Sequence, residues 1–129
     1  MMRVLLDTHL LLWTKLAPKR LPQGVRELLL DPATEPEFSV ASIWEIAIKQ
    51  SQGRRDFDVD AMVLRGELLA TGYTELAVLG EHATAVSGLP WVHKDPFDRL
   101  LIAQAIVEGI ELLTVDATLA SYPAPIRVF

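Results

Sequence analysis

The sequence of 129 residues contains no cysteine. Disulfide bonds, thiolate metal sites and thiol nucleophiles are therefore excluded, and any bound metal ion must take oxygen or imidazole ligands. A chain without disulfide chemistry suits the reducing cytoplasm, where we expect this protein to work.

Long apolar runs are also missing from the chain. No stretch approaches the roughly 20 apolar residues that cross a bilayer. Only three apolar residues separate Arg3 from Asp7, which is too short a run for a signal peptide. We therefore expect a soluble protein that makes no contact with a membrane.

The chain has no surplus of positive charge, because 12 lysines and arginines face 17 aspartates and glutamates, for a net charge of −5. A general nucleic-acid binder usually presents a basic face to phosphate, so the charge argues weakly against that class. Metal binding by some of the acids would offset this deficit. Several basic residues also lie close to acids in the sequence: Lys15, Lys19, Arg20, Lys49, Arg54, Arg55, Lys94 and Arg99.

Half of the residues are hydrophobic, which supports a well-filled core. We expect one domain over residues 1–129, because a second core in so short a chain could not stand alone. Short apolar runs alternate with helical patterns, which is typical of the α/β class, a parallel sheet covered on both faces. The patterns predict strands at 3–6, 38–41, 73–78, 110–115 and 126–129, and helices at 9–16, 22–30, 43–50, 59–70, 81–87 and 96–107, with a short helix after residue 116.

Four acids occupy similar local settings: Asp7, Glu45, Asp98 and Asp116. Each lies where the chain enters a predicted helix, and two of them directly follow predicted strands. In an open parallel sheet this arrangement gathers side chains at the carboxyl ends of the strands, where ligands bind. Carboxylates brought together repel one another unless a cation lies among them, so the pattern predicts a site for a hard divalent metal ion.

Helix capping is a simpler explanation for each acid taken alone. Ser42 and Glu45 have the spacing of a capping box, which is as good an explanation of Glu45 as a ligand role. Asp95, followed by proline, is better explained as an N-cap, which leaves Asp98 as the stronger ligand candidate. Asp7 and Asp116 could cap helices too. Four independent caps need not all be acidic, however, and this favours the metal site.

Residues near the acids have ordinary explanations as well. For Thr8 and Thr114 packing at strand ends is favoured over orienting the neighbouring carboxylates. Lys49 and Arg99 lie four residues after an acid, as in common helical ion pairs, and a grip of Arg99 on phosphate is the less favoured alternative. His9 and His93 lack a second, suitably spaced histidine, which disfavours a ligand role. The tryptophans are expected in the core or an interface: Trp13, Trp44 and Trp91.

Four segments in this order resemble the PIN-domain family, specifically its VapC-type toxins: residues 5–9, 39–46, 93–105 and 113–116. The resemblance implies a three-layer α/β/α sandwich with a short parallel sheet, and a ribonuclease that depends on Mg²⁺ or Mn²⁺. The acids of the family map onto Asp7, Glu45 and Asp98 as ligands and onto Asp116 as a more peripheral ligand or water-orienting group. Asp95 is typical of this subgroup, without a settled part in the site.

The resemblance also implies partners. These are an RNA substrate, a VapB-type antitoxin that lays an apolar helix beside the acids, and a second copy of the chain in a two-fold dimer. The sequence leaves open which RNA is cleaved and whether one or two metal ions take part.

Two other functions remain to be weighed. A phosphatase of the haloacid dehalogenase type needs a second aspartate two residues after the first, where this chain has His9. A non-catalytic PIN-fold binding module is disfavoured because all four acids are present.

Overall fold

The computed structural model describes residues 1–129 and contains a five-stranded sheet in the order β3-β2-β1-β4-β5. All neighbouring strands run parallel, so every connection is a crossover. The strands are β1 (Met2–Leu6), β2 (Thr34–Ser39), β3 (Thr74–Leu76), β4 (Glu111–Thr114) and β5 (Ile126–Val128). This confirms the expected α/β class.

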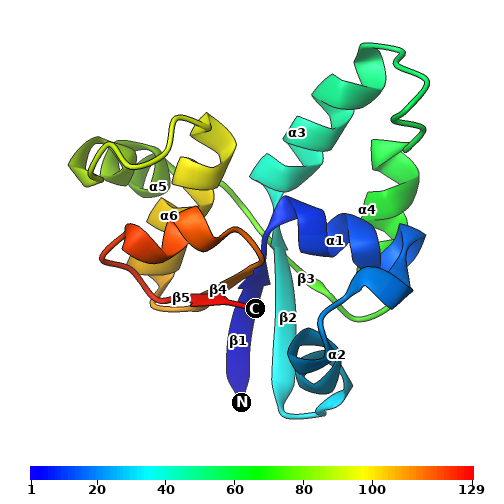
Figure 1. Cartoon of the computed structure of the whole chain (residues 1–129), viewed down its shortest axis with the longest axis horizontal. Coiled ribbons are helices and arrows are strands. Elements are labelled where there is room, and N and C mark those ends of the chain that lie inside the picture. Colours follow the sequence, from blue (N-terminus) through cyan, green and yellow to red (C-terminus); the bar gives the residue numbers. More distant parts are fainter.

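Helices cover both faces of the sheet, as the sandwich prediction requires (Figure 1). The helices are α1 (Thr8–Leu16), α2 (Gln23–Leu30), α3 (Val40–Ser51), α4 (Ala61–Ala70), α5 (Gly80–Ala85) and α6 (Pro96–Glu108), with short 3₁₀ helices at Pro18–Arg20, Val86–Gly88 and Ala117–Ser121. In Figure 1 α5 and α6 lie on the opposite side of the sheet from α1, α2 and α4. None of these helices is both long enough and apolar enough to span a bilayer.

The core consists of two apolar layers separated by the sheet. Along β1, Val4 and Leu6 pack with side chains of α1 to α4, whereas Leu5 packs with α6. This alternation is the period of two that a strand imposes on its side chains. All three residues are fully buried, which explains why a parallel strand reads as a continuous apolar run.

The prediction for the second strand and its helix was wrong. The strand spans Thr34–Ser39 instead of 38–41, and α3 begins at Val40 instead of residue 43. Pro36 and two glutamates obscured the strand, because proline is rare in an inner strand and charges are rarely buried. Here Arg3 on β1 bonds the buried carboxylate of Glu37, which makes a charged residue tolerable inside the sheet.

The strand order places β1 at the centre, with the chain moving outward through β2 and β3 and then crossing back to β4 and β5. The direction therefore reverses between β1 and β4, and the carboxyl ends of strands at such a switch point are the usual ligand site of open α/β sheets. Asp7 follows β1 directly, and Asp116 lies two residues after the last residue of β4. The fold thus brings two of the four acids to this position.

Candidate active site

Asp7 connects β1 to α1 and is almost completely buried, with 3% of its surface exposed. One carboxylate oxygen, Oδ1, accepts a hydrogen bond from the backbone N–H of Leu10 at 2.9 Å, so Asp7 is the N-cap of α1. The other oxygen, Oδ2, accepts from the Thr114 hydroxyl of β4 at 2.5 Å. The two bonds fix the carboxylate between the two strands of the switch point.

Asp98 lies in the first turn of α6, behind an N-cap that is a separate residue. The Asp95 carboxylate accepts hydrogen bonds from the N–H groups of Phe97 at 2.8 Å and Asp98 at 3.2 Å, which confirms the predicted cap. The Asp98 side chain is thereby free of capping. Its Oδ2 lies 2.9 Å from Nε2 of His93.

Asp116 caps the 3₁₀ helix that follows β4. Its Oδ1 accepts from the backbone N–H of Thr118 at 3.0 Å and from the hydroxyl of that threonine at 2.7 Å. The structure brings Asp116 together with Asp98 and His93, since one potential ligand atom from each lies within 4.8 Å of the other two. Two of the four predicted acids therefore meet closely, from elements well separated in sequence.

Glu45 is buried on α3 and is hydrogen-bonded to Thr8, the residue that follows Asp7. Its Oε1 accepts a hydrogen bond from the Thr8 hydroxyl at 2.8 Å, and its Oε2 lies 3.6 Å from Nζ of Lys49, as predicted for a helical ion pair. The capping box, one of the two explanations that the sequence left open for Glu45, is excluded, because α3 begins before Ser42 and its N-cap is Ser39. Glu45 and Asp7 lie outside the closest group of ligand atoms.

The charges of the acids influence one another. Burial raises the pKa of Asp98 to about 6, and the negative charges of Asp95 and Asp7 act in the same direction, while the hydrogen bond from His93 opposes them. Burial likewise raises the pKa of Asp7 against the hydrogen bonds from Thr114 and Leu10, and Asp116 contributes to the increase. In contrast, the hydrogen bond from the Thr118 hydroxyl lowers the pKa of Asp116. Asp7, Asp98 and Asp116 thus share one electrostatic environment.

The two threonines have a larger part than the predicted strand-end packing. Thr114 donates to Asp7, and Thr8 donates to Glu45, so both hydroxyls orient carboxylates of the site. Ser42 lies 3.0 Å from the Thr8 hydroxyl and extends this buried network. The sequence offered one sign of this role, because Thr8 and Thr114 lie close to Asp7 and Asp116 along the chain. Which carboxylate each hydroxyl contacts follows only from the structure.

Arg99 neither pairs with Asp95 nor points to the acids. It is buried, with 4% of its surface exposed, and donates to the backbone oxygen of Pro90 at 2.8 Å and to the hydroxyl of Tyr122 at 3.2 Å. The ion-pair prediction for Arg99 was therefore wrong. Of the two positions predicted for the tryptophans, the core is excluded for Trp44 and Trp91, which are 60% and 82% exposed, and the interface stays a prediction for both.

This arrangement has the chemistry of a divalent cation site. The donors are carboxylate oxygens, two of them on residues whose pKa is raised by burial and by neighbouring negative charge. A cation relieves that repulsion, and Mg²⁺ and Mn²⁺ favour oxygen donors. The residues present therefore fit such an ion.

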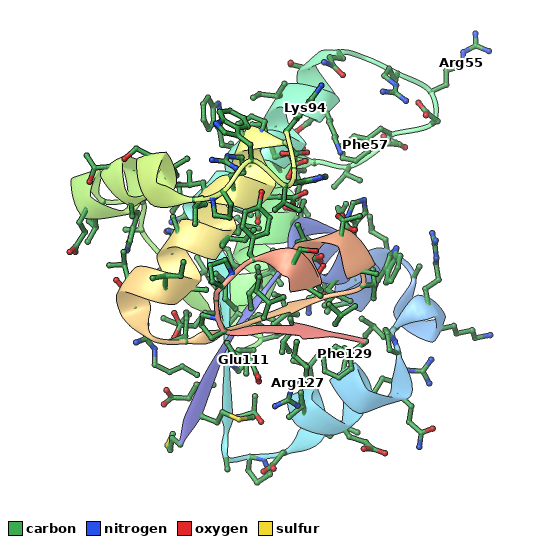
Figure 2. All side chains as sticks on the ribbon, turned by 60° about the vertical axis from the view of Figure 1, so that its left-hand side comes forward. Arg55, Phe57, Lys94, Glu111, Arg127 and Phe129 are labelled. Carbon is green, nitrogen blue, oxygen red and sulfur yellow. The ribbon has the colours of Figure 1, made fainter.

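Basic and aromatic side chains lie toward the same end of the molecule. Figure 2 shows Lys94 in the segment before α6, and Arg55 and Phe57 in the loop after α3, toward the end at which the parallel strands finish. Arg55 extends from this loop into solvent (Figure 2). These positions offer positive charge to a polyanion that approaches the acids.

Comparison with known proteins identifies a matching family and a relative in sequence. The chain matches the family model of the PIN domain over residues 4–125. It is 30% identical over 131 residues to Ribonuclease VapC22 from Mycobacterium tuberculosis, with 100% of both chains covered.

Two solved structures share the fold. One is VapBC2 from Rickettsia felis bound to a DNA fragment from their promoter, with a TM-score of 0.73, 14% identity and 98% of each chain covered. The other is DNA-bound VapBC from Salmonella typhimurium, with a TM-score of 0.67, 15% identity and coverage of 100% of this chain and 98% of that one.

Proposed function

Because the chain belongs to the PIN-domain family, we propose that it is a metal-dependent endoribonuclease and the toxin of a type II toxin–antitoxin pair in the cytoplasm. The observation that carries the proposal is the position of Asp7, Asp98 and Asp116 at the switch point of the sheet, where each carboxyl is electrostatically coupled to another. The relative of 30% identity is a ribonuclease by name, which supports the RNA substrate.

In this proposal Asp7, Glu45 and Asp98 hold Mg²⁺ or Mn²⁺, directly or through water, and Asp116 is a more peripheral ligand or orients water. Held by these residues, such an ion would supply a more nucleophilic water for hydrolysis of an RNA phosphodiester and positive charge next to the phosphoryl oxygens. Thr114 and Thr8 keep the carboxylates of Asp7 and Glu45 in fixed orientations, so that little reorganisation is needed when the ion and RNA bind.

The proposed antitoxin contact is a groove beside the acids. A cavity of about 510 Å³ between α1, the end of α3 and the following loop is lined by six apolar residues: Leu12, Trp13, Leu16, Ala17, Phe57 and Val59. The rest of its lining is polar: His9, Arg20, Lys49, Asp56 and Asp58. Of these, Lys49 pairs with Glu45, and His9 lies two residues after Asp7. An apolar helix of a VapB-type antitoxin fits such a groove, and a basic side chain from it would reach the carboxylates and block RNA.

A substrate comparison tests the proposed activity. The purified protein should cleave RNA in Mg²⁺ or Mn²⁺, fail in EDTA, and leave a generic phosphomonoester intact. Cleavage of the monoester would favour the phosphatase alternative, and inactivity toward all cellular RNA under every metal condition would favour the non-catalytic binding module. Adding the antitoxin encoded beside the gene should suppress cleavage at near-equal molar ratio.

A further inference from the structure

His93 is a potential metal ligand that the four-acid pattern leaves unused. Its Nε2 lies 2.9 Å from Asp98 Oδ2, and it belongs to the group of ligand atoms that also includes Asp116. The side chain is 27% exposed, so the imidazole lies at the edge of the site, with access to solvent ions.

The backbone of His93 is held by a buried tyrosine. The His93 N–H donates to the hydroxyl of Tyr122 at 2.9 Å, and only 4% of the Tyr122 surface is exposed. Arg99 donates to the same hydroxyl, so the tyrosine connects the segment before α6 to the helix itself. The position of His93 is therefore set by buried groups from two distant parts of the chain.

Arg99 fixes the rest of this segment. Besides Pro90, its guanidinium donates to the carbonyl oxygens of Val86 at 3.3 Å and Leu89 at 3.4 Å, and it lies 4.3 Å from the ring centroid of Trp91. None of the ion pairs in the structure includes Arg99. Its donors are thus used to hold the 86–91 turn, which places His93 beside Asp98 before any ligand binds.

The spacing of the two side chains matches that of neighbouring ligands on one ion. Two adjacent ligands of an octahedral ion with bonds of about 2.1 Å lie roughly 3.0 Å apart. His93 Nε2 and Asp98 Oδ2 already have a separation of 2.9 Å. An ion bound to both atoms lies to one side of the line that joins them, so the imidazole has to turn its Nε2 lone pair from the Asp98 oxygen to the ion, and the proton of the hydrogen bond is released to solvent.

We propose that His93 binds the divalent ion through Nε2, as a nitrogen ligand next to Asp98 and Asp116. The inference rests on the proposed function, because it concerns the same metal site. Imidazole is a better ligand for Mn²⁺ and later transition metals than for Mg²⁺, which prefers oxygen. The histidine therefore makes the site selective for Mn²⁺ over Mg²⁺.

Pulsed electron paramagnetic resonance on the protein with Mn²⁺ alone tests this inference. The wild type should show the ¹⁴N modulation of a directly bound imidazole, and His93→Ala should lose it and bind Mn²⁺ at least about tenfold more weakly. His93→Gln should also lose it, which guards against a folding defect in the alanine variant. His9→Ala is the matched control and should retain the signal. His82→Gln should retain it as well, which excludes the second group of potential ligands, Glu81, His82 and Glu108, as its source.

The outcomes separate the two proposals. Bound Mn²⁺ without ¹⁴N modulation, or modulation that persists in His93→Ala, would overturn the ligand role of His93 and leave the carboxylate site standing. A wild-type protein that binds no Mn²⁺ would overturn both.

Discussion

At the scale of single residues, helix capping is compatible with the proposed metal binding. Asp7 and Asp116 each use one oxygen as a helix cap, and Asp98 is relieved of capping by Asp95. The capping interaction orients the carboxylate, which is the property that a ligand needs. The predicted caps of Asp7 and Asp116 are confirmed, and the ligand role of both residues stays a proposal.

Asp98→Asn should abolish activity and preserve the fold. The amide keeps the shape of the side chain and removes one negative charge from the metal shell, so metal-dependent cleavage should fall at least about a hundredfold. The metal-free variant should melt at the same or a higher temperature at pH 7, because a buried, repelled charge is gone. Glu27→Gln, on the exposed surface of α2, is the control and should keep full activity. Normal cleavage by Asp98→Asn would refute the assignment.

The pKa of Asp98 predicts how stability depends on pH. Because it is raised from 3.8 to about 6, the folded protein binds more protons than the unfolded chain between these values, and this group's contribution to stability falls as pH rises through the interval. Metal-free wild type should therefore lose more stability between pH 5 and 7, in urea unfolding, than Asp98→Asn does. Parallel curves for the two proteins would show that Asp98 does not titrate in this way.

At the scale of elements, α6 was easier to predict than β2 and the start of α3. The α6 helix was expected at 96–107 and spans Pro96–Glu108, because a capped proline start and Gly109 mark both ends. Gly109 has φ of 66°, the left-handed conformation that ends a helix at low cost. The second strand was misplaced because its polarity depends on Arg3, a partner 34 residues away. Long-range pairing of this kind leaves no local signal.

Asp95 gives a prediction for α6 as a whole. Removing its carboxylate in Asp95→Ala should cost about 1 kcal/mol of stability, since two N–H groups lose their acceptor. Asp95→Ser keeps a capping oxygen and should restore most of the stability and, if Asp95 is only a cap, full cleavage activity as well. Chemical unfolding and RNA cleavage measured on both variants check this. A stable but inactive serine variant would assign Asp95 to the chemistry.

At the scale of the whole molecule, the exposed tryptophans indicate an interface. Trp44 is 60% exposed on α3 and packs edge-on against Phe97 of α6 at a ring-centroid distance of 5.3 Å, so one apolar surface spans both helices. Exposed apolar surface of this kind commonly marks a protein contact. Together with the dimer that the VapC resemblance implies, it suggests that two copies meet here.

Light scattering should give about twice 14.3 kDa for the wild type. Trp44→Arg should yield monomers, because it places a charge in the proposed interface. Met62→Arg, which replaces an exposed apolar residue of α4, should leave the dimer intact. A monomeric wild type at micromolar concentration would refute the dimer.

The strand order explains how a chain of 129 residues can assemble the candidate site. The ends of β1 and β4, the middle of α3 and the start of α6 supply the four acids. The sheet reverses its winding between β1 and β4, and among the four acids Asp98 and Asp116 come closest to each other. The local settings of the acids, at strand ends and helix starts, carried the prediction that all four converge, and the structure brings Asp98 and Asp116 closest together. The contributions of His93, Arg99 and Tyr122 did not follow from spacing, since they depend on how the segment before α6 folds back on the helix.

Anomalous diffraction from crystals soaked in Mn²⁺ tests whether the four acids form a metal site: Asp7, Glu45, Asp98 and Asp116. We expect a manganese peak at bonding distance, about 2.1 to 2.2 Å, from carboxylate oxygens of Asp98 and of at least one of Asp7, Glu45 and Asp116. The structure offers a second group of potential ligands, Glu81, His82 and Glu108, far from the switch point. A peak at that group alone, or no peak near Asp7 and Asp98 at saturating Mn²⁺, would contradict the account.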